Sequence, residues 1–99
     1  MDSPQDEQKK AEDIDIPKDK MFVKVYAPYK NYYEGIANSI SAVNDTGEFD
    51  ILPGHHRFLT LLSEGDITIR DDSDKEEVVS IKNGIMYVLS DKVTVFLDV

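Results

Sequence analysis

Hydrophobic and polar residues alternate along most of the chain after residue 20. The alternation is clearest in residues 21–27, 66–70 and 93–99, where every second residue is aliphatic or methionine. A two-residue repeat that is rich in β-branched residues is typical of half-buried strands. Because no stretch of the chain shows a sustained helical repeat, these segments predict a protein made of strands.

Turn-forming residues punctuate this pattern about every ten residues. They lie at Pro28, 44–47, Pro53-Gly54, Glu64-Gly65, 71–74, Asn83-Gly84 and Ser90-Asp91. The strands predicted between them are 21–27, 32–36, 38–44, 48–52, 58–62, 65–71, 76–82, 85–90 and 92–98. Short strands at this spacing indicate an all-β fold, an antiparallel β-sandwich of about eight to ten strands, with a barrel as the alternative. A chain of 99 residues has room for one such domain, which we assign to residues 21–99.

Residues 1–20 differ from the rest of the chain in composition. They hold seven acidic residues and four lysines, and after Met1 their only aliphatic residues are Ala11, Ile14 and Ile16. Such a segment buries too little apolar surface to offset the entropy of ordering, so we expect a disordered acidic tail. The tail is either a tether for a basic partner or a solubilising extension, and the second interpretation is favoured because charge runs are usually solvated.

Overall charge and composition exclude several classes of function. The chain carries 11 basic and 20 acidic residues, a net charge of −9, which argues against nucleic acid or an anionic lipid surface as partner. It has no cysteine, which excludes disulfides, thiolate zinc sites and a cysteine nucleophile. No apolar run is long enough to span a membrane or to act as a signal peptide, so we expect no direct membrane insertion and a cytoplasm-like compartment. A chain this small leaves little room for a catalytic cavity, and we predict that it is not an enzyme.

His55 and His56 are the first candidates for metal chemistry, because histidine is the commonest metal ligand. On a strand, however, adjacent side chains point to opposite faces. A cupin-like site also needs a nearby carboxylate and a third histidine, whereas Glu64 lies eight residues beyond His56 and the chain has only two histidines. We therefore predict no metal site, no cofactor and no catalytic residue.

Two further clusters have simpler interpretations than a ligand site. The acidic residues 71–77 lack the glycine and the final glutamate of a helix–loop–helix calcium site, and they are better explained as a solvated hairpin tip. Tyrosines 26, 29, 32 and 33 crowd the first hairpin, but a platform for single-stranded nucleic acid needs more interleaved basic residues than Lys24 and Lys30 supply. We expect these tyrosines at a sandwich edge or a protein interface. Gly47, Pro53 and Gly54 are expected to form turns, since no helix follows them to bind a phosphate.

Six blocks of sequence occur in a characteristic order: residues 25–28 (VYAP), 33–35 (YEG), 47–55 (GEFDILPGH), 59–65 (LTLLSEG), 83–88 (NGIMYV) and 93–98 (VTVFLD). Together they resemble the N-terminal β-sandwich of the epsilon chain of the F-type ATP synthase. The block ending in Pro53-Gly54-His55 is the most specific. Asp50, His56 and Asn83 depart from the family pattern, each at a turn or an exposed site. The family commonly continues into a helical hairpin where this chain ends, so we expect the inhibitory hairpin to be lacking.

The resemblance implies a non-catalytic subunit of the central stalk, which joins the gamma chain to the membrane rotor ring and couples proton flow to ATP synthesis. It implies that Glu48 and His55 meet the rotor ring, that Thr60 lies on an element facing the gamma chain, and that the protein is peripheral on the cytoplasmic face of an energy-transducing membrane, or the equivalent organelle face. An acidic surface suits basic ring loops or a basic stalk. Two alternatives stay open: a free-standing β-sandwich interaction module and, less favoured, a small metal-dependent barrel enzyme.

Overall fold

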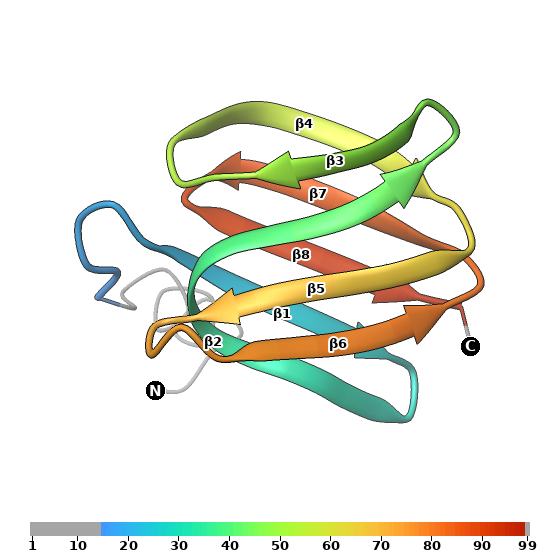
Figure 1. Cartoon of the computed structure of the whole chain (residues 1–99), viewed down its shortest axis with the longest axis horizontal. Helices are drawn as coiled ribbons and strands as arrows, with labels where there is room; N and C mark the ends of the chain where they lie inside the picture. The colour runs from blue at the N-terminus through green and yellow to red at the C-terminus, as the bar shows by residue number, and fades with distance from the viewer. Residues whose placement is uncertain (1–14, 99) are drawn as a thin grey trace, which may run out of the picture.

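The chain forms a two-layered β-sandwich, seen in a computed structural model that describes residues 15–98, apart from the side chain of His55 (Figure 1). The strands are β1 (Met21–Ala27), β2 (Lys30–Asn44), β3 (Gly47–Ile51), β4 (His55–Leu62), β5 (Gly65–Asp71), β6 (Glu76–Ile81), β7 (Gly84–Ser90) and β8 (Lys92–Leu97). No helix occurs among these described residues. The all-β sandwich predicted from the alternation is confirmed.

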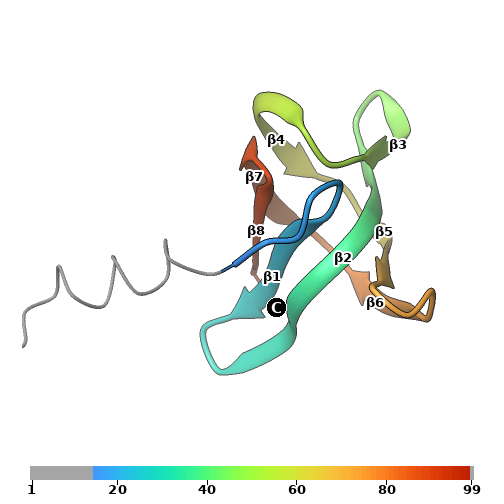
Figure 2. The same cartoon turned by 90° about the vertical axis from the view of Figure 1, so that its left-hand side faces the viewer.

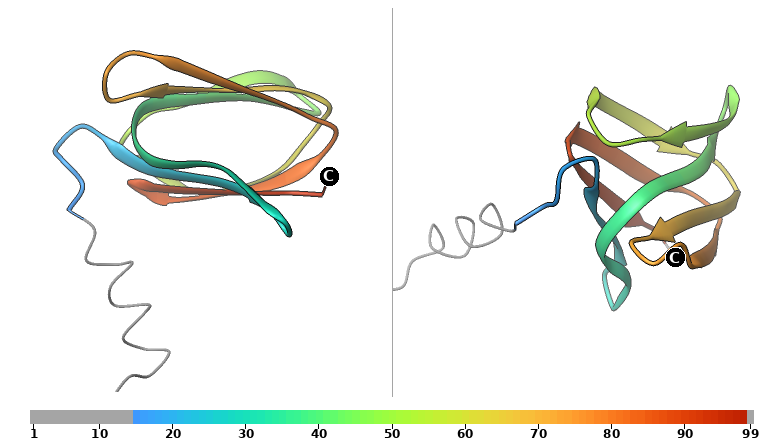
Figure 3. Two further views of the ribbon diagram at one scale, coloured as in Figure 1. Left: turned by 90° about the horizontal axis from the view of Figure 1, so that it is seen from below. Right: turned by 60° about the vertical axis from the view of Figure 1, so that its left-hand side comes forward.

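The 15-residue strand β2 connects the two layers. Its first half, residues 30–37, pairs with β1, while residues 37–44 lie between β5 and β3. One layer therefore has the order β4-β7-β8-β1-β2, and the other has the order β3-β2-β5-β6. Figure 2 shows β2 crossing from β1 toward β3 and β5, and Figure 3 shows the two layers edge-on.

Three details differ from the sequence prediction. Residues 32–36 and 38–44 are one continuous strand, because Ala37 is buried and paired with β1 rather than part of a turn. Strand β4 begins at His55 instead of residue 58. The pairing is mixed, since β1 and β8 run parallel while the other strand pairs are antiparallel. Only a crossover connection permits this parallel pair, because a tight hairpin reverses the chain direction.

The core lies between the layers and is filled by the inward members of each alternating strand. The buried hydrophobic residues are Met21, Val23, Val25, Ala27, Ala37, Ile40, Ala42, Ile51, Leu62, Ile67, Ile69, Ile81, Met86, Val88, Val93, Val95 and Leu97. In β2 the register shifts between Ala37 and Ser39, so that Ala37 and Ile40, three residues apart, are both buried. At the open edge between β3 and β4, the rings of Phe49 and Phe58 meet edge to face with centroids 6.0 Å apart.

Polar contacts attach the start of the domain to β2 and to the β5–β6 turn. The Lys20 ammonium donates to the Asn38 side-chain oxygen and pairs with Asp72 at 3.2 Å. The Asn38 amide in turn donates to the Asp71 carbonyl at 3.0 Å and to the Asp74 carboxylate at 3.2 Å. Lys20 therefore has specific partners on the sandwich. The greater part of the predicted acidic tail, residues 1–14, lies outside the described residues.

Candidate partner-binding surfaces

The segment from β3 to the start of β4 holds most of the residues predicted to bind a partner. Gly47 begins β3 with a φ of 119°, and Gly54 has a φ of 82° in the turn that it forms with Pro53. Both angles lie in the left-handed region that glycine adopts without steric cost, so these glycines set the direction of the chain at each end of the segment. His55 follows as the first residue of β4, opposite Ser90 of β7, and its side chain lies outside the described part of the structure.

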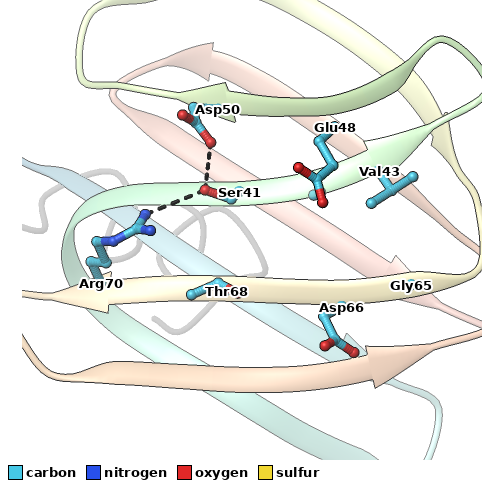
Figure 4. Close-up of a pocket in the computed structure, with 9 residues that line it drawn as sticks. Ser41, Val43, Glu48, Asp50, Gly65, Asp66, Thr68 and Arg70 are labelled. Carbon is cyan, nitrogen blue, oxygen red and sulfur yellow. Dashed lines mark hydrogen bonds between the residues drawn. The ribbon is translucent and has the colours of Figure 1, made fainter.

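Glu48 lines a shallow polar groove of about 530 Å³ across β3, β2 and β5 (Figure 4). In the sheet register Glu48 is opposite Val43, and the neighbouring row contains Asp50 opposite Ser41. Ser41 donates to Asp50 at 2.5 Å and accepts from Arg70 at 3.3 Å. The groove brings Glu48 and Asp50 of β3 together with Asp66 of β5, a proximity that was not predicted from the sequence.

The groove is part of a larger surface that we call the acidic outer face. It comprises the outward side chains of β3, the second half of β2, β5 and β6: Glu48, Asp50, Ser41, Val43, Asp66, Thr68, Arg70, Glu76, Val78 and Ser80. Four of these are carboxylates and one is a cation. Arg70 pairs with Glu76 at 3.2 Å and donates to the buried Ser39 hydroxyl at 3.2 Å. This surface is suited to contact with water or with basic groups.

Thr60, predicted to face the gamma chain, turns away from the exposed side of β4. Its hydroxyl accepts a hydrogen bond from the Asn44 amide at 3.2 Å and lies 3.4 Å from the Leu61 carbonyl oxygen, to which it donates. Its neighbours Leu59 and Leu61 point outward instead and are 66% and 71% exposed. The threonine was predicted to bind a partner and the two leucines were not, although the alternation along the strand places them on opposite sides.

These leucines belong to a second surface, which we call the apolar outer face. It comprises the outward side chains of β4, β7, β8 and β1: Leu59, Leu61, Ile85, Tyr87, Leu89, Lys92, Thr94, Phe96, Phe22, Lys24 and Tyr26. Strand pairing aligns Leu61, Ile85, Phe96 and Tyr26 in one row across four strands. At one end of the row lies a mainly apolar groove of about 380 Å³, lined by Leu61, Leu62, Asn83, Gly84, Ile85, Phe96 and Asp98.

Aromatic side chains and lysines gather where the apolar outer face meets the β1–β2 hairpin. Tyr26 packs edge to face on Phe96 with centroids 5.2 Å apart, and the Lys24 ammonium lies 4.9 Å from the Tyr26 ring centroid. At the hairpin tip Tyr29 is 98% exposed. By contrast, Tyr32 and Tyr33 pack against the core. The predicted cluster of four tyrosines is therefore divided between the surface and the interior.

The predicted hairpin tip is formed by residues 71–75, and the acidic residues Glu76 and Glu77 begin β6. β5 and β6 pair up to Arg70 and Glu76, and one Asp71 oxygen accepts the backbone N–H groups of Ser73 at 2.8 Å and Lys75 at 3.0 Å. The hydrogen bond from Lys75, followed by those from Ser73, lowers the pKa of Asp71 below its ordinary value of 3.8. Burial, followed by the nearby carboxylates of Asp71, Glu77 and Asp72, raises the pKa of Tyr33 above 10.0. These shifts belong to the turn and its neighbour rather than to a catalytic site.

Neither a metal cluster nor a membrane-spanning helix appears in the described part of the chain. No three histidine, cysteine, aspartate or glutamate side chains are grouped there as metal ligands would be. No helix among residues 15–98 combines the length and hydrophobicity needed to cross a bilayer. What the geometry offers is two broad outer faces of opposite character, a form suited to binding proteins.

Comparison with known proteins gives a consistent family and fold. The family model for the ATP synthase delta/epsilon chain β-sandwich domain matches residues 20–99. The ATP synthase epsilon chains of Brevibacillus brevis and Geotalea uraniireducens are each 34% identical to this chain, over 79 and 80 residues. These matches cover 80% and 81% of the chain but 60% and 57% of the relatives, so the chain spans somewhat more than half their length.

Solved structures show the same fold at low sequence identity. A chain of the Euglena gracilis mitochondrial ATP synthase superposes with a TM-score of 0.75 at 18% identity, covering 86% of this chain and 54% of that one. A chain from the central stalk and c-ring structure of the Tetrahymena thermophila mitochondrial ATP synthase gives a TM-score of 0.66 at 22% identity, covering 81% and 64%. The sandwich is therefore an arrangement already seen in ATP synthases.

Proposed function

Because this chain belongs to the family of ATP synthase delta/epsilon chain β-sandwich domains, we propose that it is a non-catalytic subunit of the central stalk of a proton-driven F-type ATP synthase. In this role it joins the gamma chain to the membrane rotor ring and helps couple proton flow to ATP synthesis. The observation that carries the proposal is the family match over residues 20–99, which includes all eight strands. The proposed role puts the protein at the periphery of an energy-transducing membrane, on the cytoplasmic or equivalent organelle face.

The architecture supports a mechanical role. Seventeen hydrophobic side chains fill the space between two layers that are joined through the single long strand β2. Close-packed interiors have low compressibility, so a force applied to one part of the sandwich is transmitted to another with little deformation. A subunit that passes torque between two partners needs this stiffness and two binding surfaces, and it needs no reactive group.

We assign the rotor-ring contact to the segment that contains Glu48 and His55. Glu48 is on the acidic outer face, in the polar groove with Asp50 and Asp66, where it is available to a basic or polar loop. We assign the contact with the gamma chain to strand β4, on which Thr60 lies. The Thr60 hydroxyl itself is not part of that contact, because it accepts a hydrogen bond from Asn44.

Complementation of an ATP synthase that lacks its own epsilon chain tests the function. The full chain is added to such an enzyme in inverted membrane vesicles, and proton-driven ATP synthesis is measured. We expect coupled synthesis to rise with the wild-type chain. A wild-type chain that neither assembles with the complex nor raises synthesis overturns the proposal.

The double variant Glu48→Gln, His55→Ala tests the site. We expect it to remain folded by circular dichroism and to lose most of the coupled synthesis, because the polar contact with the ring is weakened. Glu77→Gln is a matched control, since Glu77 is an exposed carboxylate of β6 whose register parity places it off the acidic outer face. Unchanged synthesis by the double variant contradicts the assignment of Glu48 and His55 while leaving the proposed function in place.

A further inference from the structure

We propose that the free edge of β6 is a docking site for one extended segment of a partner protein, which pairs with β6 as an additional strand. The segment that fits this edge is hydrophobic where it passes Val78 and Val79, and it carries a lysine or arginine where it passes Glu76 and Glu77. Strand β6 lies at the opposite edge of its layer from β3, which holds Glu48, and β4 belongs to the other layer. The inference therefore goes beyond the proposed function and does not depend on it.

The backbone of β6 is available for pairing along its whole outer side. β6 is the last strand of its layer, and among residues 15–98 its one strand partner is β5. A row of backbone N–H and C=O groups without a neighbouring strand is a template for strand addition. The pairing of β5 with β6 runs from residue 76 to residue 81 without a register shift, and β6 contains no proline. Bulges and prolines protect the edges of many natural sheets, and β6 has neither.

The other edges of the two layers are closed or irregular. β3 and β4 approach each other where the rings of Phe49 and Phe58 meet. The pairing of β4 with β7 shifts register between His55 and Phe58, and the pairing of β1 with β2 shifts between Val25 and Tyr26. Among the described strands, β6 therefore offers the edge best suited to the addition of a regular strand.

The side chains of β6 define the centre of the partner segment. On the inward side they become more exposed toward the start of the strand: Ile81 is buried, Val79 is partly buried against the core, and Glu77 is exposed. On the outward side Val78 is 55% exposed. An added strand would place its own side chains directly opposite the two valines and remove both from water. We therefore expect hydrophobic, preferably β-branched residues at these positions of the partner.

The charge at the start of β6 defines one end of the partner segment. Residues 71–77 hold five carboxylates and one lysine. Lys20 pairs with Asp72 at 3.2 Å. Arg70 pairs with Glu76 at the same distance. Neither of these ion pairs involves Glu77, and carboxylates outnumber cations around this end of the edge. The surplus favours a partner that brings a basic residue there.

The layer behind β6 favours a single segment over a second copy of the chain. Figure 1 shows the first half of β2 and the β1–β2 hairpin extending below β6, and Figure 3 shows that this hairpin belongs to the other layer. Edge-to-edge pairing of two whole sandwiches would press the hairpin of each copy against that layer of the other copy. One added strand needs only about 4.8 Å beside β6. A net charge of −9 on each chain also opposes self-association.

A synthetic peptide with this pattern tests the inference on the full chain. Six alternating threonine and valine residues are followed by two lysines, which lie beside Glu76 and Glu77 when the peptide pairs antiparallel to β6. We expect saturable binding, and slower hydrogen exchange of the β6 backbone amides by NMR than in the free chain. The control peptide has the same sequence with N-methyl groups throughout its backbone. It has no N–H groups to donate to the edge, so it should bind at least about tenfold more weakly.

Variants of the chain locate the binding site. Val78→Lys should weaken peptide binding at least about fivefold, because it replaces a hydrophobic contact at the edge with a like charge. Val43→Lys is the matched control: Val43 lies on the same outer face but on β2, inside the layer, so this variant should bind within about twofold of wild type. Glu77→Gln should weaken binding about twofold to fivefold at low salt, and the difference should shrink as salt is raised. Circular dichroism checks that each variant is folded.

Several results would overturn the inference. They are a failure of the wild-type chain to bind the peptide, binding without protection of the β6 amides, and equal binding of the N-methylated peptide. Wild-type affinity in Val78→Lys would place the contact away from β6 and overturn it as well. If sedimentation shows a dimer of the free chain that Val78→Lys dissociates, the occupant is a second copy and not a partner segment. Each of these results leaves the proposed function in place, because the contacts assigned to it lie on other strands.

Discussion

Strands β7 and β5 occupy opposite layers of the sandwich and bury the same kind of residue, yet they differ completely on their outward sides. On β7 the outward residues are Ile85, Tyr87 and Leu89, whereas on β5 they are Asp66, Thr68 and Arg70. The inward residues of both strands are methionine or β-branched. Packing in the core therefore accounts for the inward residues of each strand. The outward residues are suited either to water or to a binding partner. The contrast indicates that the two outer faces bind different chemistry.

The largest expected effect on stability distinguishes the buried side chains from the outward side chains in the layer that carries the apolar outer face. Met86→Ala removes a fully buried side chain next to Ile85 and should lower the free energy of unfolding by about 2–5 kcal/mol, through lost burial and the cavity left behind. Leu61→Ala, at a side chain that is 71% exposed, should cost only about 0.5 kcal/mol. Urea denaturation at neutral pH measures both.

A large loss of stability in Leu61→Ala would contradict the contrast between the buried and the outward side chains of this layer. It would mean that the apolar outer face supports the isolated fold, and the need for a partner to explain its composition would disappear. Conversely, an unfolding free energy close to that of wild type shows that the Leu61 side chain is dispensable for folding.

An intermediate effect is expected on the acidic outer face. Arg70→Ala removes the ion pair with Glu76 and the hydrogen bond to the buried Ser39 hydroxyl, and it should lower the free energy of unfolding by about 0.5–1 kcal/mol. Both side chains of the ion pair are about half exposed, so solvent screens most of their attraction. The measurement is urea denaturation at low and high salt.

Arg70→Lys serves as the matched control for this prediction, since it keeps the charge and loses the geometry that reaches both Ser39 and Glu76. We expect it to recover part of the loss at low salt. Wild-type stability in Arg70→Ala would contradict the view that polar cross-strand contacts stabilise the outward side of this layer.

The smallest expected effect is a pH dependence at the tip of the β5–β6 hairpin. The pKa of Asp71 is lower in the folded chain than its ordinary value of 3.8, so its carboxylate stabilises the fold above that pH. This contribution is lost as the pH falls through the folded-state pKa. The difference in urea midpoint between wild type and Asp71→Asn should therefore narrow on acidification from pH 5 to below pH 3.

Ser73→Ala is the control, because it removes one hydroxyl contact at 3.1 Å and leaves the backbone N–H donors of Ser73 and Lys75 in place. It should retain most of the pH dependence of wild type. If the difference between wild type and Asp71→Asn stays constant across the range, the hydrogen-bonded turn does not perturb the carboxylate and the hairpin tip is held by pairing alone.

Sequence reasoning predicted the strands well wherever alternation and turn residues agreed. β1, β5 and β8 alternate cleanly, and the hairpin tip at residues 71–75 carries its own turn chemistry, so each was located within a residue or two. β2 was divided in two because nothing in residues 36–38 reveals that one strand passes between layers. At the candidate site, Glu48 was found through a family motif, whereas its proximity to Asp66 depends on a cross-strand register that no local pattern contains.

The sequence by itself determined the fold class, because alternation with period two commits each strand to one buried side and one outward side. The family-specific turn around Pro53 and Gly54 was likewise readable from local residues. Only the tertiary structure decided which outward residues share a face. The row that joins Leu61 to Tyr26 and the groove that holds Glu48 and Asp66 are formed by strands distant in sequence. Their alignment is set by how the strands pair and pack rather than by any single strand.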